Sequence, residues 1–220
     1  MATSHEKCAS FVCSFLSPKT NLPRGRGIMS NSRRTPFREI LADTPIIAAV
    51  KDMNGLEQCL ESDIQVIFIL FGDVCSLQEI VKKVKDAGKI AMVHMDLVSG
   101  FTGKEIVLDY IKQYTHADGI ITTKVNLIKY AKQIGLYTVL RYFVVDSMAL
   151  SNIVKQVDSI QPDVIEILPG IMPGIIKKVN KISKVPVIAG GLIADKKDVM
   201  TALTNGAVAI SATSPEVWFM

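Results

Sequence analysis

Short apolar runs alternate with longer amphipathic segments along the chain from Pro45 onward. The apolar runs are rich in β-branched residues and predict eight strands, at 46–50, 66–71, 90–96, 119–123, 137–145, 164–170, 185–191 and 207–211. The intervening segments have helical spacing of apolar residues and predict helices near 54–61, 76–88, 103–114, 126–135, 147–160, 173–183 and 195–206. Such continuous apolar runs are typical of parallel strands buried on both faces.

This order of elements predicts a compact TIM-type (β/α)8 barrel formed by residues 35–220. An open doubly wound sheet is the alternative, and the missing glycine-rich fingerprint after the first strand counts against it. Only SPEVWFM follows the eighth strand, so we expect the last helix to be truncated to a turn or two. TPFREILAD (35–43), with Thr35 as N-cap and Pro36 at the first helical position, predicts an extra N-terminal helix that covers the bottom of the barrel.

The chain before this helix has a different character. Residues 1–28 show no hydrophobic periodicity, and Arg24, Arg26, Arg33 and Arg34 make the region basic. We therefore expect residues 1–34 to be a disordered basic N-terminal extension. A basic arm of this kind is suited to contact nucleic acid, although a merely solvated tail is the alternative.

Composition indicates a soluble, cytoplasmic protein. The chain is 49% hydrophobic, enough for a sizeable core, yet no apolar run reaches the roughly 18 to 20 residues needed to span a bilayer. The four cysteines form no CxxC pair, which fits a reducing compartment. CASFVCSFL (8–16) lacks a small-x-small cleavage site, so export is not expected. We expect no membrane partner.

The ends of the seventh and eighth strands carry the clearest chemical signal. Ligands of such barrels bind at the carboxyl ends of the strands. Gly190 and Gly191 allow a tight turn and a close approach of the backbone, and Ser211, Thr213 and Ser214 add hydroxyl groups after the next strand. Because Ser214-Pro215 is a helix start whose N–H groups favour anions, this region predicts a phosphate monoester site.

Charged residues interrupt several other apolar strands. His94 and Asp96 lie two apart and share a strand face, while Arg141 and Glu166 stand inside otherwise apolar runs. An unpaired buried charge costs several kcal/mol, so Arg141 and Glu166 either pair with each other or face a polar ligand. For His94 a core position and a ligand contact remain equally open, whereas Asp96 is expected to contact the ligand.

No catalytic or metal-binding arrangement is evident. The sequence contains no HxH or HExxH motif and no carboxylates at ligand spacing, so we expect no metal and no other cofactor. No Ser–His–Asp or Cys–His arrangement is indicated by spacing. The predicted mouth of the barrel is therefore compatible with catalysis without requiring it.

Six segments of the barrel together resemble one known family. They are VHMDLVSG (93–100), DGIITTKVNLI (118–128), RYFVVDS (141–147), DVIEILPGIMP (163–173), PVIAGGLI (186–193) and AVAISATSPEVW (207–218). In this order and spacing they resemble the glycerol uptake operon antiterminator, the glycerol-3-phosphate-responsive regulatory protein of bacteria. The resemblance begins near Pro45, and the conjunction of EILPGIMP with AGGLI is its most specific part.

The resemblance implies a barrel that binds glycerol 3-phosphate and acts on leader mRNA, where it prevents premature transcription termination of glycerol-utilisation genes. It implies a regulator and not an enzyme. The matched positions that we expect to contact the ligand are Asp96, Thr122, Arg141, Glu166, Gly170, Gly190, Gly191, Ser211 and Thr213. Leader RNA would contact either the N-terminal arginines or helix lysines such as Lys82, Lys83, Lys177 and Lys178.

Two other functions stay open at this point. One is an enzyme acting on a phosphosugar or glycerol phosphate, in which Asp96, Glu166 and Arg141 would surround the substrate. The other is a sugar-phosphate sensor that acts only through protein partners. Whether the chain forms a homodimer is also open.

Overall fold

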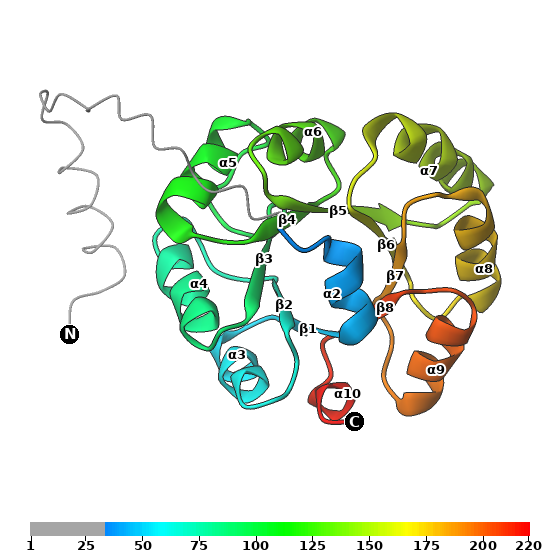
Figure 1. Ribbon diagram of the computed structural model, residues 1–220, viewed down its shortest axis with the longest axis horizontal. Coiled ribbons are helices and arrows are strands. Elements are labelled where there is room, and N and C mark those ends of the chain that lie inside the picture. Colours follow the sequence, from blue (N-terminus) through cyan, green and yellow to red (C-terminus); the bar gives the residue numbers. More distant parts are fainter. Residues whose placement is uncertain (1–33) are drawn as a thin grey trace, which may run out of the picture. The chain divides into compact units, whose positions relative to one another are not determined.

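The computed structural model describes residues 34–220, apart from the side chain of Val154. The predicted basic extension therefore lies outside the described residues except for Arg34. Strands and helices alternate along this range (Figure 1). They are α2 (Phe37–Asp43), β1 (Ile46–Val50), α3 (Met53–Leu60), β2 (Val66–Ile69), α4 (Leu77–Asp86), β3 (Ile90–His94), α5 (Ile106–Tyr110), the π-helical turn η2 (Ile111–Thr115), β4 (Gly119–Thr122), α6 (Val125–Gln133), β5 (Tyr137–Phe143), α7 (Ser147–Ile160), β6 (Val164–Leu168), α8 (Pro173–Ile182), β7 (Val187–Gly190), α9 (Lys196–Thr204), β8 (Ala209–Ala212) and α10 (Pro215–Trp218).

The eight strands form a closed parallel barrel in sequence order. Pairing of β1 with β8, in the register Ile46↔Ile210 and Ala48↔Ala212, closes the sheet. This closure confirms the predicted (β/α)8 barrel and excludes the open doubly wound sheet. The last helix, α10, has four residues, as expected for a truncated unit. No helix described between residues 34 and 220 is long and apolar enough to cross a lipid bilayer.

Alternation along each strand divides the core into an inner and an outer layer. Ile47 and Ala49 of β1 and Phe68 of β2 belong to the apolar cluster inside the barrel, whereas Ala48 and Ile67 belong to the cluster under the helices. Because successive side chains of a strand point to opposite faces, each strand of a barrel supplies both layers. The strands are therefore apolar on both sides, which is the pattern that the sequence displays.

Helix α2 covers the amino-terminal end of the barrel, as predicted. Phe37 and Leu41 pack into the inner cluster, and the Phe37 ring stacks on Tyr137 at a centroid distance of 4.8 Å. The predicted start of this helix was wrong by one residue, because Pro36 has an extended ψ of 135° and occupies the N-cap position. No side chain caps this helix, so burial of its apolar face accounts for its position.

Six of the eight predicted strands, those for β2 to β7, extend too far at their carboxyl ends. Strand β3 stops at His94 and β6 at Leu168, because the following apolar residues belong to loops at the mouth of the barrel. Aspartates begin three of the following helices: the side chains of Asp52, Asp146 and Asp195 each accept a hydrogen bond from an N–H in the first turn. These caps orient the turns that surround the mouth.

We expect Phe37→Ala to lower the free energy of unfolding by about 3–5 kcal/mol, because it removes a fully buried ring from the closed end of the barrel. Urea denaturation measures the change. Arg38→Ala, at an exposed position of the same helix, is the control and should change stability by less than about 1 kcal/mol. Equal effects of the two substitutions would contradict a structural role for α2.

Candidate functional site

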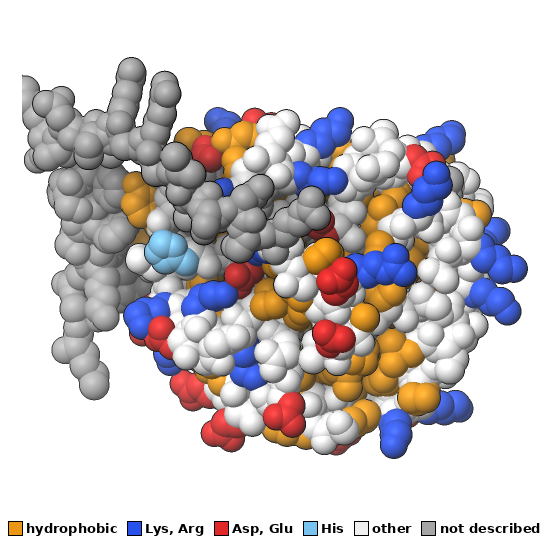
Figure 2. Space-filling view, in the orientation of Figure 1, with side chains coloured by type: hydrophobic (Ala, Val, Ile, Leu, Met, Phe, Trp, Pro, Cys, Tyr) orange, Lys and Arg blue, Asp and Glu red, His pale blue; other side chains and the backbone are white. Residues whose placement is uncertain are grey.

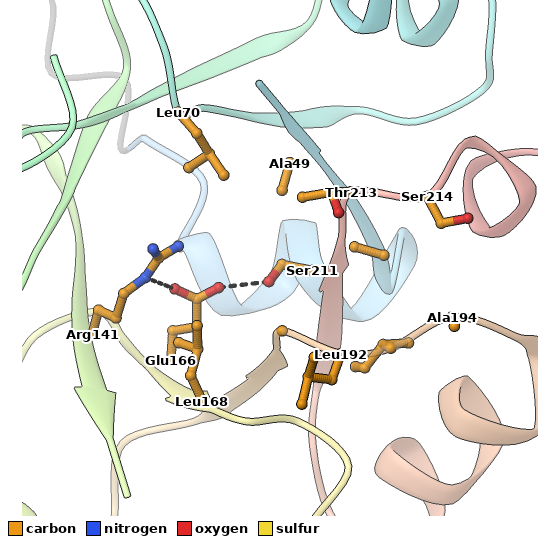
Figure 3. Close-up of a pocket in the computed structure, with 13 residues that line it drawn as sticks. Ala49, Leu70, Arg141, Glu166, Leu168, Leu192, Ala194, Ser211, Thr213 and Ser214 are labelled. Atoms are coloured by element: carbon orange, nitrogen blue, oxygen red, sulfur yellow. Dashed lines mark hydrogen bonds and ion pairs between the residues drawn. The ribbon is translucent and has the colours of Figure 1, made fainter. Parts of the chain in front are cut away.

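A cavity of about 390 Å³ lies at the carboxyl-end face of the barrel (Figure 3). This volume is in the range of small-molecule sites, about 300–1,000 Å³. Its polar side chains come from β5, β6 and β8 and from the loop after β8, whereas the loop after β7 supplies glycine and apolar residues. The cavity is lined by Ala49, Leu70, Arg141, Glu166, Leu168, Gly191, Leu192, Ile193, Ala194, Ser211, Ala212, Thr213 and Ser214.

Glu166 is the centre of the polar floor of this cavity. Its carboxylate is fully buried and accepts two hydrogen bonds, from Arg141 Nε at 2.5 Å and from Ser211 Oγ at 2.5 Å. Figure 3 shows the carboxylate between these two partners. The two charged residues are direct neighbours across β5 and β6. From the sequence, Arg141 and Glu166 were expected either to pair with each other or to face a polar ligand. The ion pair is present, and both residues also line the cavity.

Gly190 makes room for this network. A Cβ atom at this position would lie 2.5 Å from Glu166 Oε1 and 2.6 Å from Ser211 Oγ, closer than real contacts allow. The role of Gly190 is thus to let two polar side chains meet beside the end of β7. A tight turn, the role expected from the sequence, belongs to Gly191, whose φ is +75°.

The guanidinium of Arg141 keeps free donors. Within residues 34–220 its Nε donates to Glu166, and its two terminal nitrogens have no hydrogen-bond acceptor. Figure 3 shows these nitrogens on the side of the cavity that carries Leu70. Because an arginine stays protonated and has five N–H donors, Arg141 can hold Glu166 and a ligand oxygen at the same time.

Main-chain N–H groups form the rim of the cavity at the two predicted corners. No hydrogen bond described within residues 34–220 is donated by the N–H of Leu192, Ile193, Thr213 or Ser214. Leu192 follows Gly191 and has the left-handed φ of 62°, which is uncommon for a residue with a side chain. Free N–H groups on a left-handed turn are typical of anion sites. Since α10 is a single short turn, these N–H groups matter more than a helix dipole.

Five of the nine predicted ligand residues line the cavity: Arg141, Glu166, Gly191, Ser211 and Thr213. Gly190 lies under its floor. Gly170 lies behind the rim, where its N–H donates to the Gly191 carbonyl oxygen at 2.9 Å. A Cβ on Gly170 would be 2.9 Å from Gly190 N, so only glycine fits between these loops.

The structure does not bring Asp96 and Thr122 into this cavity. Asp96 lies in the turn after β3, where it accepts hydrogen bonds from Thr122 Oγ1 at 3.1 Å and Thr123 N at 2.8 Å. It also forms an ion pair with Lys124 at 3.2 Å. Burial raises the pKa of Asp96, but the hydrogen bonds from Thr123, Lys124 and Thr122 outweigh it and hold the pKa below its ordinary value. Asp96 thus joins the ends of β3 and β4.

His94 is a buried group of the barrel interior that remained ambiguous in the sequence. Its Nδ1 accepts a hydrogen bond from the Asp96 N–H at 3.2 Å, so the proton of the neutral ring lies on Nε2. This Nε2 is buried without a hydrogen-bond partner among the described residues. Burial and the positive charge of Arg141 lower the pKa of His94 to about 4. His94 therefore presents an unpaired neutral donor within the barrel.

No metal site accompanies these residues in the part of the chain that the structure describes. Within residues 34–220, no three His, Cys, Asp or Glu side chains gather as metal ligands would. The described residues supply the cavity with a neutral ion pair on its floor, hydroxyl groups beside it and N–H groups on its rim.

Comparisons with known proteins point to one family. The sequence model of the family described as glycerol-3-phosphate responsive antiterminator matches residues 46–218, which is the barrel from β1 to α10. The chain is also 44% identical over 183 residues to the uncharacterized protein YgcP of Escherichia coli (strain K12). The matched region covers 83% of this chain and 96% of that protein.

Two solved structures with related sequences have the same fold. The glycerol uptake operon antiterminator regulatory protein from Listeria monocytogenes str. 4b F2365 is 34% identical with a TM-score of 0.77, over 80% of this chain and 95% of that one. A glycerol uptake operon antiterminator-related protein from Thermotoga maritima MSB8 is 35% identical with a TM-score of 0.71, over 80% and 98% of the respective chains.

The burial of neutral His94 predicts a specific dependence of stability on pH. An unfolded histidine has a pKa of about 6.5, so between pH 6.5 and about 4 the unfolded chain binds more protons and stability falls as the pH falls. The wild type should lose on the order of 3 kcal/mol of its free energy of unfolding over this range because of His94, and we expect His94→Gln to lack this part of the loss. Urea unfolding across this pH range measures it, with His116→Gln at an exposed loop as the control. Parallel curves for the wild type and His94→Gln would contradict the prediction.

The Arg141–Glu166 pair predicts strong energetic coupling. We expect Glu166→Gln to cost about 3–5 kcal/mol of stability, because it leaves the Arg141 charge buried and unpaired. The double variant Arg141→Met/Glu166→Gln should cost less than the sum of the single variants, since no unpaired charge remains. Chemical denaturation of the four proteins tests this cycle, and additive costs would show that the two residues act independently.

Proposed function

The chain belongs to the glycerol-3-phosphate responsive antiterminator family, and on that basis we propose that its cavity binds glycerol 3-phosphate to control binding of leader mRNA. The mRNA partner is the leader of glycerol-utilisation genes, in which the bound protein prevents premature termination of transcription. Because this partner is made in the bacterial cytoplasm, the protein acts there.

The observation that carries the ligand proposal is the division of the cavity into two chemical zones. The rim has free N–H groups at Leu192, Ile193, Thr213 and Ser214, which suit the three terminal oxygens of a phosphate monoester. The floor has Glu166, Ser211 and Arg141, which suit hydroxyl groups that both donate and accept hydrogen bonds. Glycerol 3-phosphate has a phosphate at one end and two hydroxyl groups at the other.

The charges of the floor favour this orientation over the reverse. Glu166 would repel a phosphate placed directly on it, whereas the same carboxylate is a good acceptor for a hydroxyl group. The ion pair with Arg141 leaves the floor neutral as a whole, and the free Arg141 nitrogens add positive charge on one side. The phosphate is therefore assigned to the rim and the glycerol hydroxyl groups to the floor.

An enzyme acting on a phosphosugar or glycerol phosphate is the second candidate, since Glu166 is a buried carboxylate at the ligand site. Both of its oxygens already accept hydrogen bonds, from Arg141 and from Ser211. Each carboxylate oxygen can accept a second hydrogen bond, so Glu166 can still bind a ligand hydroxyl group in either function. The match to a family of regulators therefore favours a regulator over an enzyme.

Ligand control of RNA binding requires two states with different affinities for the ligand. The loops that form the rim are suited to such a response because they enclose the ligand and also join helices on the outside of the barrel. Tight ligand binding by one state stabilises it at the expense of the other by the difference in binding free energy.

We expect glycerol 3-phosphate to stabilise the protein by about 2.7 kcal/mol when present at 100 times its Kd. Gly191→Val should abolish this stabilisation while the barrel stays folded, because the φ of +75° disfavours valine and its side chain would meet Leu168 at the rim. Gly174→Val is the matched control, since a Cβ there meets no atom within 4 Å. Thermal unfolding followed by circular dichroism measures the shift.

The same samples separate binding from turnover. Glycerol and inorganic phosphate, each offered alone, should stabilise the protein far less than glycerol 3-phosphate, since each fills only one zone. The ligand should be recovered chemically unchanged after incubation. No stabilisation at millimolar ligand would overturn the regulator proposal, and conversion of the ligand to a product would favour the enzyme.

A further inference from the structure

We infer that helix α8 carries the RNA-binding surface and that this surface contacts the phosphate backbone of a paired RNA stem. The inference rests on the proposed function, because it names where the RNA binds and in which form. The surface consists of Lys177, Lys178 and Lys181 of α8 together with Lys184, two residues beyond its end; we call it the α8 lysine face.

The α8 lysine face lies in a part of the sequence without opposing charge. From Ile167 to Ala194 the chain contains these four lysines and no acidic residue. All four are exposed, and none forms an ion pair within residues 34–220. Figure 2 shows Lys and Arg side chains along the edge of the molecule where α8 and α9 lie in Figure 1.

The other pair of lysines that the sequence offered is neutralised. Lys82 forms an ion pair with Asp86, and Lys83 lies 3.4 Å from Glu57. An RNA phosphate at α4 would therefore have to compete with carboxylates that are already in place. At α8 a phosphate meets lysines without such competitors, so the release of counterions yields the larger gain in affinity.

The packing of α8 holds its lysines outward. Ile176 and Val179 are fully buried against the barrel, which places Lys177, Lys178 and Lys181 on the opposite side of the helix. Lys177 and Lys181 are one turn apart, about 6 Å along the axis. Figure 1 shows α7 and α9 on either side of α8, and these helices add the exposed Lys155, Lys196 and Lys197. The lysines of α8 thus lie on the exposed side of a packed helix.

The composition of this part of the barrel favours a double-stranded RNA over a single strand. From Val144 to Val217 the chain contains no aromatic residue, no histidine and no arginine. Proteins that read single-stranded RNA stack its bases on aromatic rings or guanidinium planes, and α7 to α9 have neither. Lysines alone contact phosphates without stacking, which suits a double-stranded stem recognised by its shape and backbone.

The start of α8 is directly connected to the candidate ligand pocket. The short segment before Pro173 contains Gly170, whose N–H donates to the Gly191 carbonyl oxygen at 2.9 Å. Leu168, at the end of β6, lines the cavity and lies against Gly191. A ligand that orders the Gly191 turn thus acts on the segment that leads into α8.

The test compares two matched pairs of lysines in the full-length protein. Binding of a labelled RNA hairpin from the leader is followed by fluorescence anisotropy over a range of KCl concentrations. We expect Lys177→Gln/Lys178→Gln to weaken binding at least tenfold at low salt and to reduce the slope of log K against log salt by about 1.5. Lys82→Gln/Lys83→Gln should bind like the wild type. A single-stranded RNA of the same length should bind more weakly than the hairpin.

Each outcome supports or overturns a separate claim. Glycerol 3-phosphate should stabilise the Lys177→Gln/Lys178→Gln variant as much as it stabilises the wild type. Equal stabilisation verifies that the ligand site of the variant is intact. Unchanged RNA binding in that variant would overturn the α8 lysine face, and a loss in Arg24→Gln/Arg26→Gln would assign the contact to the N-terminal arginines. Preference for the single strand would overturn the paired-stem assignment. Failure of the wild type to bind either RNA would overturn the proposed function itself.

Discussion

The buried carboxylate of Glu166 is the constraint on which the candidate site depends. A charge with no exposed surface is costly unless it is paired, and Arg141 and Ser211 supply the pairing from β5 and β8. These contacts link three strands across the mouth of the barrel, and the absence of a side chain at Gly190 lets them form. One buried charge therefore determines the positions of an arginine, a serine and a glycine that lie far apart in the sequence.

This network also explains why the cavity suits recognition. Its floor is neutral and rigid, because each charge is held by a partner, and its rim consists of main-chain N–H groups that no side chain of the described residues occupies. A ligand with a charged end and a hydroxylated end matches both zones. The same rim is bonded through Gly170 to the segment that begins α8, so the pocket and the basic exterior are parts of one continuous structure.

Sequence patterns predicted the fold well and identified part of the cavity lining. The barrel follows from apolar periodicity, which reflects local geometry and burial, and the closing helix follows from its Thr35-Pro36 start. Arg141, Glu166, Gly191, Ser211 and Thr213 line the cavity because they stand at or just after the carboxyl ends of their strands, and their contact with a ligand stays a prediction. Asp96 and Thr122 also stand at or just after strand ends, but Thr122 donates a hydrogen bond to Asp96. The position of a polar residue at a strand end does not reveal whether a neighbouring residue already forms a hydrogen bond with it. The sequence left His94 open between a core position and a ligand contact, and only the structure shows that its Nε2 has no hydrogen-bond partner among the described residues.

The amino-acid sequence by itself determined the order of strands and helices, their apolar faces, and the family to which the barrel belongs, because these depend on the spacing of residue types along one chain. Tertiary structure alone decided which polar groups meet. It paired Glu166 with Arg141 and Ser211, committed Asp96 to the β3–β4 junction, and placed Lys83 of α4 beside Glu57 of α3. The physical reason is that the energy of a charge depends on its distance from other charges in space, and closure of the barrel sets those distances.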